Sequence, residues 1–221
     1  MSDDAKDLAT DPGPVVVTET APDDAVAAGN FWTQLRPVST VAAWVLLVCG
    51  ILGLAAGIAL TLDRIQILID PTFVPACSIN PVISCGSVMV TEQGKFFGFP
   101  NPLLGLPAFT VIIVTAVLSI GRIKLPRWWW AGQAVGSAFG VVFVGYLIFQ
   151  SIYRIHALCP YCMVVWTITP IVLILSLSRV LPDTERGRSV RETMWLILPL
   201  FYVVVIAMAT VKFWDYWRTL F

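Results

Sequence analysis

The chain has 221 residues, of which 57% are hydrophobic and 13% charged, and its mean hydropathy is +0.82. A soluble domain has roughly 25% charged residues, so this composition excludes an ordinary water-soluble fold and indicates an integral membrane protein. The formal net charge is zero, which gives no sign of nucleic-acid binding, because such proteins carry a basic surface.

Residues 1–35 differ in composition from the rest of the chain. Their sequence, which begins MSDDAKDLATDPGPVVVTETAPDDAVAAGN, is acidic, contains Pro and Gly and has no apolar periodicity. It also lacks the basic n-region followed by an apolar core that marks a secretory signal. We therefore expect residues 1–35 to form a disordered cytoplasmic tail and residues 36–221 to form the transmembrane domain.

Five windows without Asp, Glu, Lys or Arg follow this tail. Crossing about 30 Å of hydrocarbon takes about 20 helical residues, and each window is long enough. Backbone groups in lipid must pair within their own segment, so the spans are expected to be helical. The predicted transmembrane helices cover about residues 41–62, 103–121, 128–150, 158–178 and 193–211. The predicted fold class is all-α integral membrane, with an outer loop at residues 63–100.

The distribution of Lys and Arg predicts the orientation of these spans. With the amino terminus inside, nine of the 14 Lys and Arg residues lie in inner segments and five in outer ones. Cytoplasmic loops are enriched in these residues. We therefore expect a cytoplasmic amino terminus and an extracytoplasmic carboxyl terminus.

Four of the five cysteines fall on the predicted outer side. Cys77 and Cys85 lie in the outer loop, within CSINPVISC, and Cys159 and Cys162 begin the fourth span, within CPYC. This is the side on which disulfides persist in bacteria. The fifth, Cys49, lies in the middle of the first span, where we expect it to act as small apolar packing.

The CPYC motif has the features of a reactive dithiol. Pro160 suits the first turn of a helix, because its missing N–H would have no partner there. Cys159 and Cys162 then share a helix face near the positive end of the helix dipole, which favours the thiolate. A thiolate attacks disulfides and quinones, so the motif predicts redox chemistry.

From the residues alone, several other interpretations stay open. A zinc site usually combines two C-x2–4-C knuckles or adds histidines, whereas the loop pair is C-x7-C and His156 is the one histidine, so we expect no metal. The cysteines could form static disulfides between the loop and the fourth span, as in a transporter or membrane scaffold. His156 could stabilise the Cys159 thiolate or simply lie at the interface. Asn101, in FPNPLLG, could cap a loop or donate a hydrogen bond to a ligand carbonyl.

Taken together, these motifs resemble the vitamin K epoxide reductase (VKOR) family, specifically a bacterial homologue. The matching parts are CSINPVISC, the following SVMVTEQGKFFGFPNPLLG with its glycines and N-x-x-x-G turn, and the C-x-x-C that opens the fourth span. The similarity covers residues 40 to about 180. It implies a four-helix bundle around a quinone, either menaquinone or ubiquinone, with a fifth helix packed outside, in the plasma membrane of a bacterium.

The resemblance also implies a direction of electron flow through the cysteines. Electrons would pass from a reduced thioredoxin-like or DsbA-like extracytoplasmic partner to the loop pair, then to the C-x-x-C, then to the quinone, supporting disulfide formation in secreted proteins. Cys77 would exchange with the partner, and Cys85 would form a mixed disulfide with Cys159. Cys162 would react with the quinone.

Two further residues are assigned to the quinone by the resemblance. Asn101 would bond a quinone carbonyl, and Trp166, where vertebrate members have Tyr, would pack on the ring and offer an N–H instead of an O–H. Thr91 stands where a Ser commonly follows the loop pair. Some bacterial members carry a fused thioredoxin-like domain, whereas ten residues follow the fifth span here, so we expect a separate partner protein. A DsbB-type oxidase has four spans with C-x-x-C in the first outer loop, which does not fit five spans.

Overall fold

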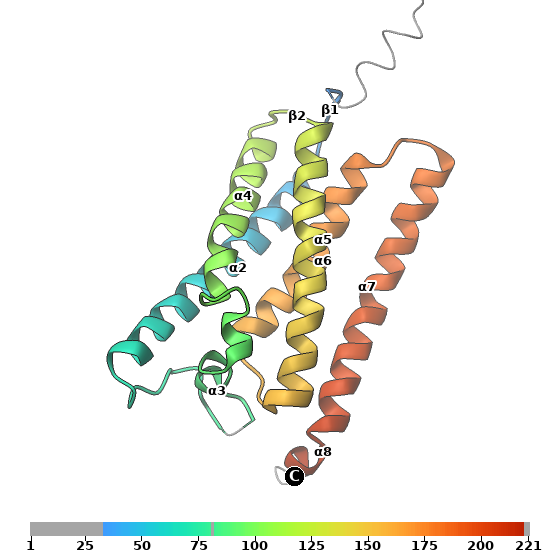
Figure 1. Ribbon diagram of the computed structural model, residues 1–221. Helices are drawn as coiled ribbons and strands as arrows, with labels where there is room; N and C mark the ends of the chain where they lie inside the picture. The colour runs from blue at the N-terminus through green and yellow to red at the C-terminus, as the bar shows by residue number, and fades with distance from the viewer. Residues whose placement is uncertain (1–32, 81, 219–221) are drawn as a thin grey trace, which may run out of the picture. The chain divides into compact units, whose positions relative to one another are not determined.

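The computed structural model describes residues 33–80 and 82–218 (Figure 1). Its elements in chain order are β1 (Leu35–Arg36), α2 (Thr40–Ile69), α3 (Cys85–Met89), η1 (Glu92–Lys95), α4 (Pro102–Ile120), β2 (Leu125–Pro126), α5 (Arg127–Gln150), the π-helical turn η2 (Ser151–Ile155), α6 (Pro160–Val180), α7 (Glu185–Lys212) and α8 (Trp214–Trp217). The predicted tail, residues 1–35, lies outside the described residues except for its last three positions.

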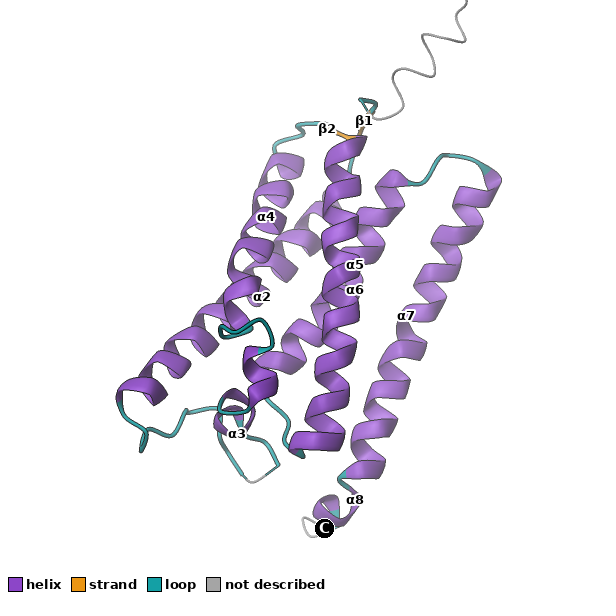
Figure 2. Ribbon diagram, viewed as in Figure 1, coloured by secondary structure: helices purple, strands orange, loops and turns teal. Residues whose placement is uncertain are grey.

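Among the described residues, five helices are long and apolar enough to cross a membrane: α2, α4, α5 continued by η2, α6 and α7 (Figure 2). This confirms the predicted all-α membrane fold with five transmembrane helices. Helix α2 continues past the predicted end at residue 62 to Ile69, and α7 begins at Glu185 instead of residue 193. The difference arises because a charged residue ends an apolar window but does not end a helix.

Helices α2, α4, α5 and α6 form the bundle, and α7 packs at its edge (Figure 1). Helix α2 packs against α4, and α6 packs against both α5 and α2. The core between them includes Leu46, Phe109, Trp130 and Val172. Helix α7 contacts α6, and the side chains of its apolar window are exposed or half-buried. It is therefore the peripheral fifth helix that was predicted.

Glycines allow α2 and α4 to approach each other closely. A Cβ added at Gly53 would lie 2.3 Å from the Phe109 ring, and one added at Gly50 would lie 2.6 Å from Ile113 Cγ1. Phe109 belongs to the buried core, so its ring has little room to move aside. The contact between these helices therefore depends on the missing side chains.

Polar contacts join the chain at the end of the bundle opposite α3 (Figure 1). Strands β1 and β2 pair there in antiparallel register. The buried Arg127 side chain donates from Nη1 to Gln34 Oε1 at 3.1 Å and from Nη2 to the Leu181 carbonyl at 3.4 Å. Arg36 forms an ion pair with Asp183 and lowers the pKa of that carboxyl. These contacts tie the amino-terminal segment to the α6–α7 connection.

The close contact of α2 and α4 predicts a stability effect. Gly53→Val should lower the free energy of unfolding by about 1–3 kcal/mol, because an overpacked core must shift its neighbours. Thermal unfolding in detergent measures this. The control Gly145→Ala, whose added Cβ meets nothing within 4 Å, should leave Tm unchanged or higher, because Ala favours the helix. An unchanged Tm for Gly53→Val would contradict the packing described.

Candidate active site

A parallel β-bridge holds the outer loop against the start of α6. Ile83 pairs with Leu158. The Leu158 N–H donates to the Val82 carbonyl at 2.6 Å, and the Leu158 carbonyl accepts from the Ser84 N–H at 3.0 Å. A cysteine follows the bridge in both segments, so the pairing brings one cysteine of each pair together.

Local side-chain contacts shape the loop that makes this bridge. Asn80 Oδ1 accepts from the Val82 N–H at 3.0 Å and from the Ile83 N–H at 2.6 Å. Ser84 caps α3, because its Oγ accepts from the Ser87 N–H at 3.2 Å. Asn and Ser form such contacts readily in turns and at helix starts. The residues between the two loop cysteines therefore fix the loop's conformation.

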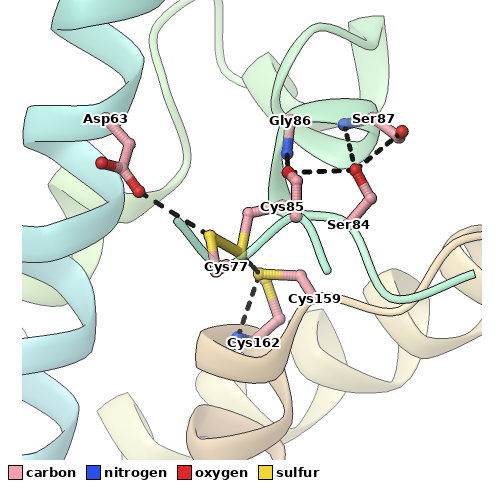
Figure 3. Close-up of a disulfide and its surroundings, with 9 residues drawn as sticks. Asp63, Cys77, Ser84, Cys85, Gly86, Ser87, Cys159 and Cys162 are labelled. Atoms are coloured by element: carbon pink, nitrogen blue, oxygen red, sulfur yellow. Dashed lines mark hydrogen bonds between the residues drawn. A yellow bond between two sulfur atoms is a disulfide. The ribbon is translucent and has the colours of Figure 1, made fainter. Parts of the chain in front are cut away.

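Cys77, Cys85, Cys159 and Cys162 lie close together at this point (Figure 3). Cys77 and Cys85 form a disulfide, whereas Cys159 and Cys162 carry free thiols. Cys159 Sγ lies 3.3 Å from Cys85 Sγ, within the range of about 3–3.5 Å expected of reacting atoms. The disulfide closes within the loop instead of joining the loop to α6, which does not match the static cross-link considered from the sequence.

Cys159 is placed to ionise more readily than Cys162. It is the N-cap of α6, and its sulfur accepts from the Cys162 backbone N–H at 3.5 Å. Pro160 occupies the first turn, as predicted. The side-chain hydrogen bond from Cys162 lowers the pKa of Cys159, in spite of the burial that opposes it. Cys159 is therefore the thiol that can act as attacking or leaving thiolate.

Asp63 is a member of this site that the sequence did not single out. It lies on the part of α2 beyond the predicted span, and its Oδ2 is 3.8 Å from Cys77 Sγ (Figure 3). The one signal in the sequence was a charged residue directly after an apolar window. That signal alone does not say which part of a 38-residue outer loop the carboxylate faces.

His156 does not join the cysteines. It ends η2 with a left-handed backbone, at φ +57°, and its side chain is exposed. The described side-chain contacts of Cys159 are with Cys85 and Cys162. Within residues 33–80 and 82–218, no group of three or more His, Cys, Asp or Glu residues has the arrangement of a metal site.

A cavity of about 520 Å³ lies beside Cys162, inside the bundle. Helices α4, α5 and α6 supply most of its lining, which is largely apolar and includes Asn101, Phe143 and Trp166. Its volume is within the range of about 300–1,000 Å³ typical of small-molecule sites. Cys162 therefore lies between Cys159 and a space that can hold a ligand.

Trp166 lines this cavity, and its indole N–H is buried in the wall. The side chain is 6% exposed, and its Nε1 has no hydrogen-bond partner among the described residues. A buried donor without a partner costs about 1–3 kcal/mol. A ligand acceptor in the cavity would remove that cost, and a quinone carbonyl has the required chemistry.

Asn101 lines the same cavity but also caps the loop before α4. Its Oδ1 accepts from the Phe96 N–H at 3.0 Å, and its Nδ2 donates to the Gln93 carbonyl at 2.7 Å. The loop cap considered from the sequence is therefore present, and the hydrogen bond to a ligand carbonyl stays a prediction. The amide has two N–H groups, and among the described residues the second has no partner.

The segment between the cysteine loop and Asn101 contains the two glycines noted in the sequence. A Cβ on Gly94 would lie 3.0 Å from the Val88 carbonyl, and Gly98 has a left-handed φ of +82° that favours glycine. Thr91 caps η1, because its Oγ1 accepts from the Gly94 N–H at 3.2 Å. These contacts fold the segment back so that Asn101 reaches it.

A sequence model described as the vitamin K epoxide reductase family matches residues 44–177. The matched range contains both cysteine pairs, Asp63, Asn101 and Trp166. A search of curated proteins found no match to the chain.

The arrangement of the two thiols of α6 predicts a pH effect. Cys162→Ala should raise the pKa of Cys159, because it removes the hydrogen bond that lowers it. In the variant, the Cys159 thiolate should therefore form at a higher pH than in the wild type. The Cβ chemical shift of Cys159 in cysteine-labelled protein, followed by NMR across pH, measures this midpoint without a reagent that must reach the fully buried sulfur.

The control for this experiment is Cys49→Ala. Cys49 is also a free thiol, but it is buried in the core among α2, α4 and α6. Its loss should leave the Cys159 midpoint unchanged. A midpoint that Cys162→Ala does not move would contradict the hydrogen bond between the two thiols.

Proposed function

The chain belongs to the vitamin K epoxide reductase family, and from this premise we propose that it is a quinone-linked thiol oxidoreductase that supports disulfide formation in secreted proteins. The family and the five apolar helices make it a multi-pass membrane oxidoreductase. The observation that carries the finer proposal is the position of Cys159 Sγ, 3.3 Å from the loop disulfide. Its neighbour Cys162 lines the cavity, so a continuous path joins the loop to the ligand space.

In this proposal a thioredoxin-like dithiol first reduces the loop disulfide. Cys77 is 8% exposed and Cys85 is fully buried, so the partner thiolate reaches Cys77 more readily. It forms a bond to Cys77 and expels Cys85. The partner's second thiol then breaks that mixed disulfide, which leaves the partner oxidised and both loop cysteines as thiols.

The loop thiols next reduce the C-x-x-C pair. Cys85 attacks Cys159 of an oxidised Cys159–Cys162 disulfide and releases Cys162. Cys77 then attacks Cys85 and releases Cys159. The result is a Cys77–Cys85 disulfide with two free thiols on α6, which is the state of the cysteines in this structure.

The reduced pair on α6 must then give up two electrons and two protons. A quinone bound in the cavity would supply the two-electron acceptor. The residues present fit such a group, because the cavity walls are largely apolar. Among the described residues, the buried Trp166 indole N–H has no partner and Asn101 keeps one N–H. Cys159 and Cys162 close to a disulfide as they are oxidised, ready for the next pair of electrons.

We also propose a cytoplasmic amino terminus in a bacterial cell membrane. Four arginines gather near the end of the bundle opposite the cysteines, where they contact Asp183, Gln34 and backbone carbonyls: Arg36, Arg127, Arg179 and Arg191. Cytoplasmic ends of membrane proteins are enriched in such residues. The cysteines would then face the compartment in which disulfides are made.

Purified protein with a reduced thioredoxin-like substrate and a soluble quinone tests this function, with quinone absorbance as the readout. Cys162→Ala should lower the rate of quinone reduction about a hundredfold or more, because the thiol at the cavity is lost. Cys77→Ala should lose activity with the protein substrate but keep activity with dithiothreitol, which can reduce the α6 pair directly. Cys49→Ala, a thiol away from the path, should behave as wild type.

Two outcomes would contradict the proposal. Quinone reduction that survives Cys162→Ala would remove Cys162 from the path. If neither pair changed redox state when the quinone was depleted, as judged by alkylation of quenched protein, the disulfides would be static and the protein a scaffold or transporter.

The unpaired indole N–H predicts a binding effect. Trp166→Phe should raise KM for the quinone about tenfold, because a lost hydrogen bond costs about 1.4 kcal/mol, while the ring still fills its place. The matched control is Trp130→Phe, which removes another buried indole N–H without a partner among the described residues, but in the core instead of the cavity lining. Equal KM values for both variants would contradict the role of Trp166.

A further inference from the structure

We propose that Asp63 is the general base for the second half of the internal electron transfer, in which Cys77 attacks Cys85. This inference rests on the proposed function and adds a catalytic residue to it. Asp63 would take the proton from the Cys77 thiol while the Cys77–Cys85 bond forms and the mixed disulfide between loop and α6 breaks.

The geometry places four chemical roles in order (Figure 3). Asp63 Oδ2 lies 3.8 Å from Cys77 Sγ, which is a hydrogen-bond distance for a thiol donor. Cys77 is bonded to Cys85, and Cys159 Sγ lies 3.3 Å beyond Cys85 Sγ. A base, a nucleophile, the attacked sulfur and the leaving sulfur therefore follow one another across α2, the loop and α6.

The atoms and electrons of this step balance within the chain. Before it, Cys77 is a thiol and Cys85 is bonded to Cys159. The Cys77 sulfur forms a bond to Cys85 Sγ, the Cys85–Cys159 bond breaks, and its electron pair leaves on Cys159. The proton of Cys77 passes to Asp63. One disulfide exists before and after, so the step needs no outside oxidant.

The contact of Cys159 with Cys162 also favours this step, in which Cys159 is released. Cys159 leaves as a thiolate, and the hydrogen bond from Cys162 stabilises that charge. Cys162 therefore donates a hydrogen bond to the negative charge that forms on Cys159, while the Asp63 carboxylate accepts the proton that Cys77 loses. Both contacts are present in the state that the step produces.

A base is useful at Cys77 because its thiol is shielded from water. Cys77 is 8% exposed, and an ordinary thiol with a pKa of about 8.5 is only about 3% ionised at pH 7. Among the described residues of the surrounding cluster, the other titratable side chains are Cys85, Cys159, Tyr161 and Cys162. The carboxylate that contacts Cys77 comes from Asp63, whose own neighbour on α2 is Arg64.

The first test is the pH dependence of quinone reduction driven by the reduced protein substrate. Asp63→Asn should lower the rate about ten- to thirtyfold at pH 7, the upper limit being set by the thiolate fraction of about 3%. The deficit should shrink as pH approaches 9, because Cys77 then ionises without help. Asp63→Glu, which keeps a carboxylate, should restore part of the rate.

The matched control is Asp70→Asn, which removes the same charge near the end of α2. Asp70 Oδ1 accepts from Thr72 and does not contact a cysteine among the described residues. This variant should match the wild type at every pH. Quinone reduction driven by dithiothreitol, which bypasses the loop, should be unchanged in Asp63→Asn. If this activity were lost, Asp63 would be needed for folding and the proposal would be overturned.

The second test detects the intermediate instead of the overall rate. Acid-quenched Asp63→Asn protein should contain the Cys85–Cys159 disulfide at several times the wild-type level during turnover, as measured by non-reducing peptide mapping. Cys77→Ser, which has no resolving thiol, is the positive control for this peptide.

Several outcomes would overturn the role of Asp63. An equal loss of rate at all pH values would indicate a structural effect, and a faster Asp63→Asn variant would mean that the carboxylate only repels thiolates. Absence of the intermediate would place Asp63 outside the resolving step. If the wild type itself failed to reduce quinone with a protein dithiol, the proposed function would fail. If the wild type were active and Asp63→Asn had the same rate as Asp70→Asn at every pH, only the role of Asp63 would be rejected.

Discussion

The site depends on one short β-bridge between the outer loop and the residue before the C-x-x-C motif. Two backbone hydrogen bonds join Leu158 to Val82 and Ser84, and the next residue in each segment is a cysteine. Without them the sulfurs of Cys85 and Cys159 would belong to independent segments and would meet only by chance. With them, the two sulfurs are held 3.3 Å apart, and the proposed exchange between the pairs would be an intramolecular reaction.

The location of the C-x-x-C at the start of a transmembrane helix gives its two thiols different surroundings. Cys159, as the N-cap, faces the loop disulfide and accepts a hydrogen bond from the Cys162 backbone N–H. Cys162, one turn later, lines an apolar cavity within the bundle. One motif of four residues therefore connects a disulfide outside the bundle to a ligand space inside it. The length of the transmembrane helix separates the disulfide from the cavity, and the helix N-terminus stabilises the Cys159 thiolate.

The sequence predicted the five helices, because charge-free windows and membrane thickness leave few alternatives, and the resemblance to the family implied the peripheral place of α7. It also predicted the family from the order and spacing of two cysteine pairs. The contact of Asp63 with Cys77 was not predictable, since it depends on α2 continuing as a helix beyond its first charge. The hydrogen bonds of Asn101 to Gln93 and Phe96 depend on how the glycine segment folds back. Such contacts arise from tertiary packing, which a local pattern does not encode.

The central claim is that Cys85 and Cys159 exchange electrons directly. The most direct measurement is a count of free thiols, with peptide mapping, in purified protein carrying Cys49→Ala, Cys77→Ala and Cys162→Ala, after mild oxidation. Only Cys85 and Cys159 remain in this protein. The account predicts that both thiols disappear together and that one peptide pair linked through Cys85 and Cys159 replaces them. If both thiols were still free after oxidation, as judged by alkylation of the denatured protein, the account would be contradicted.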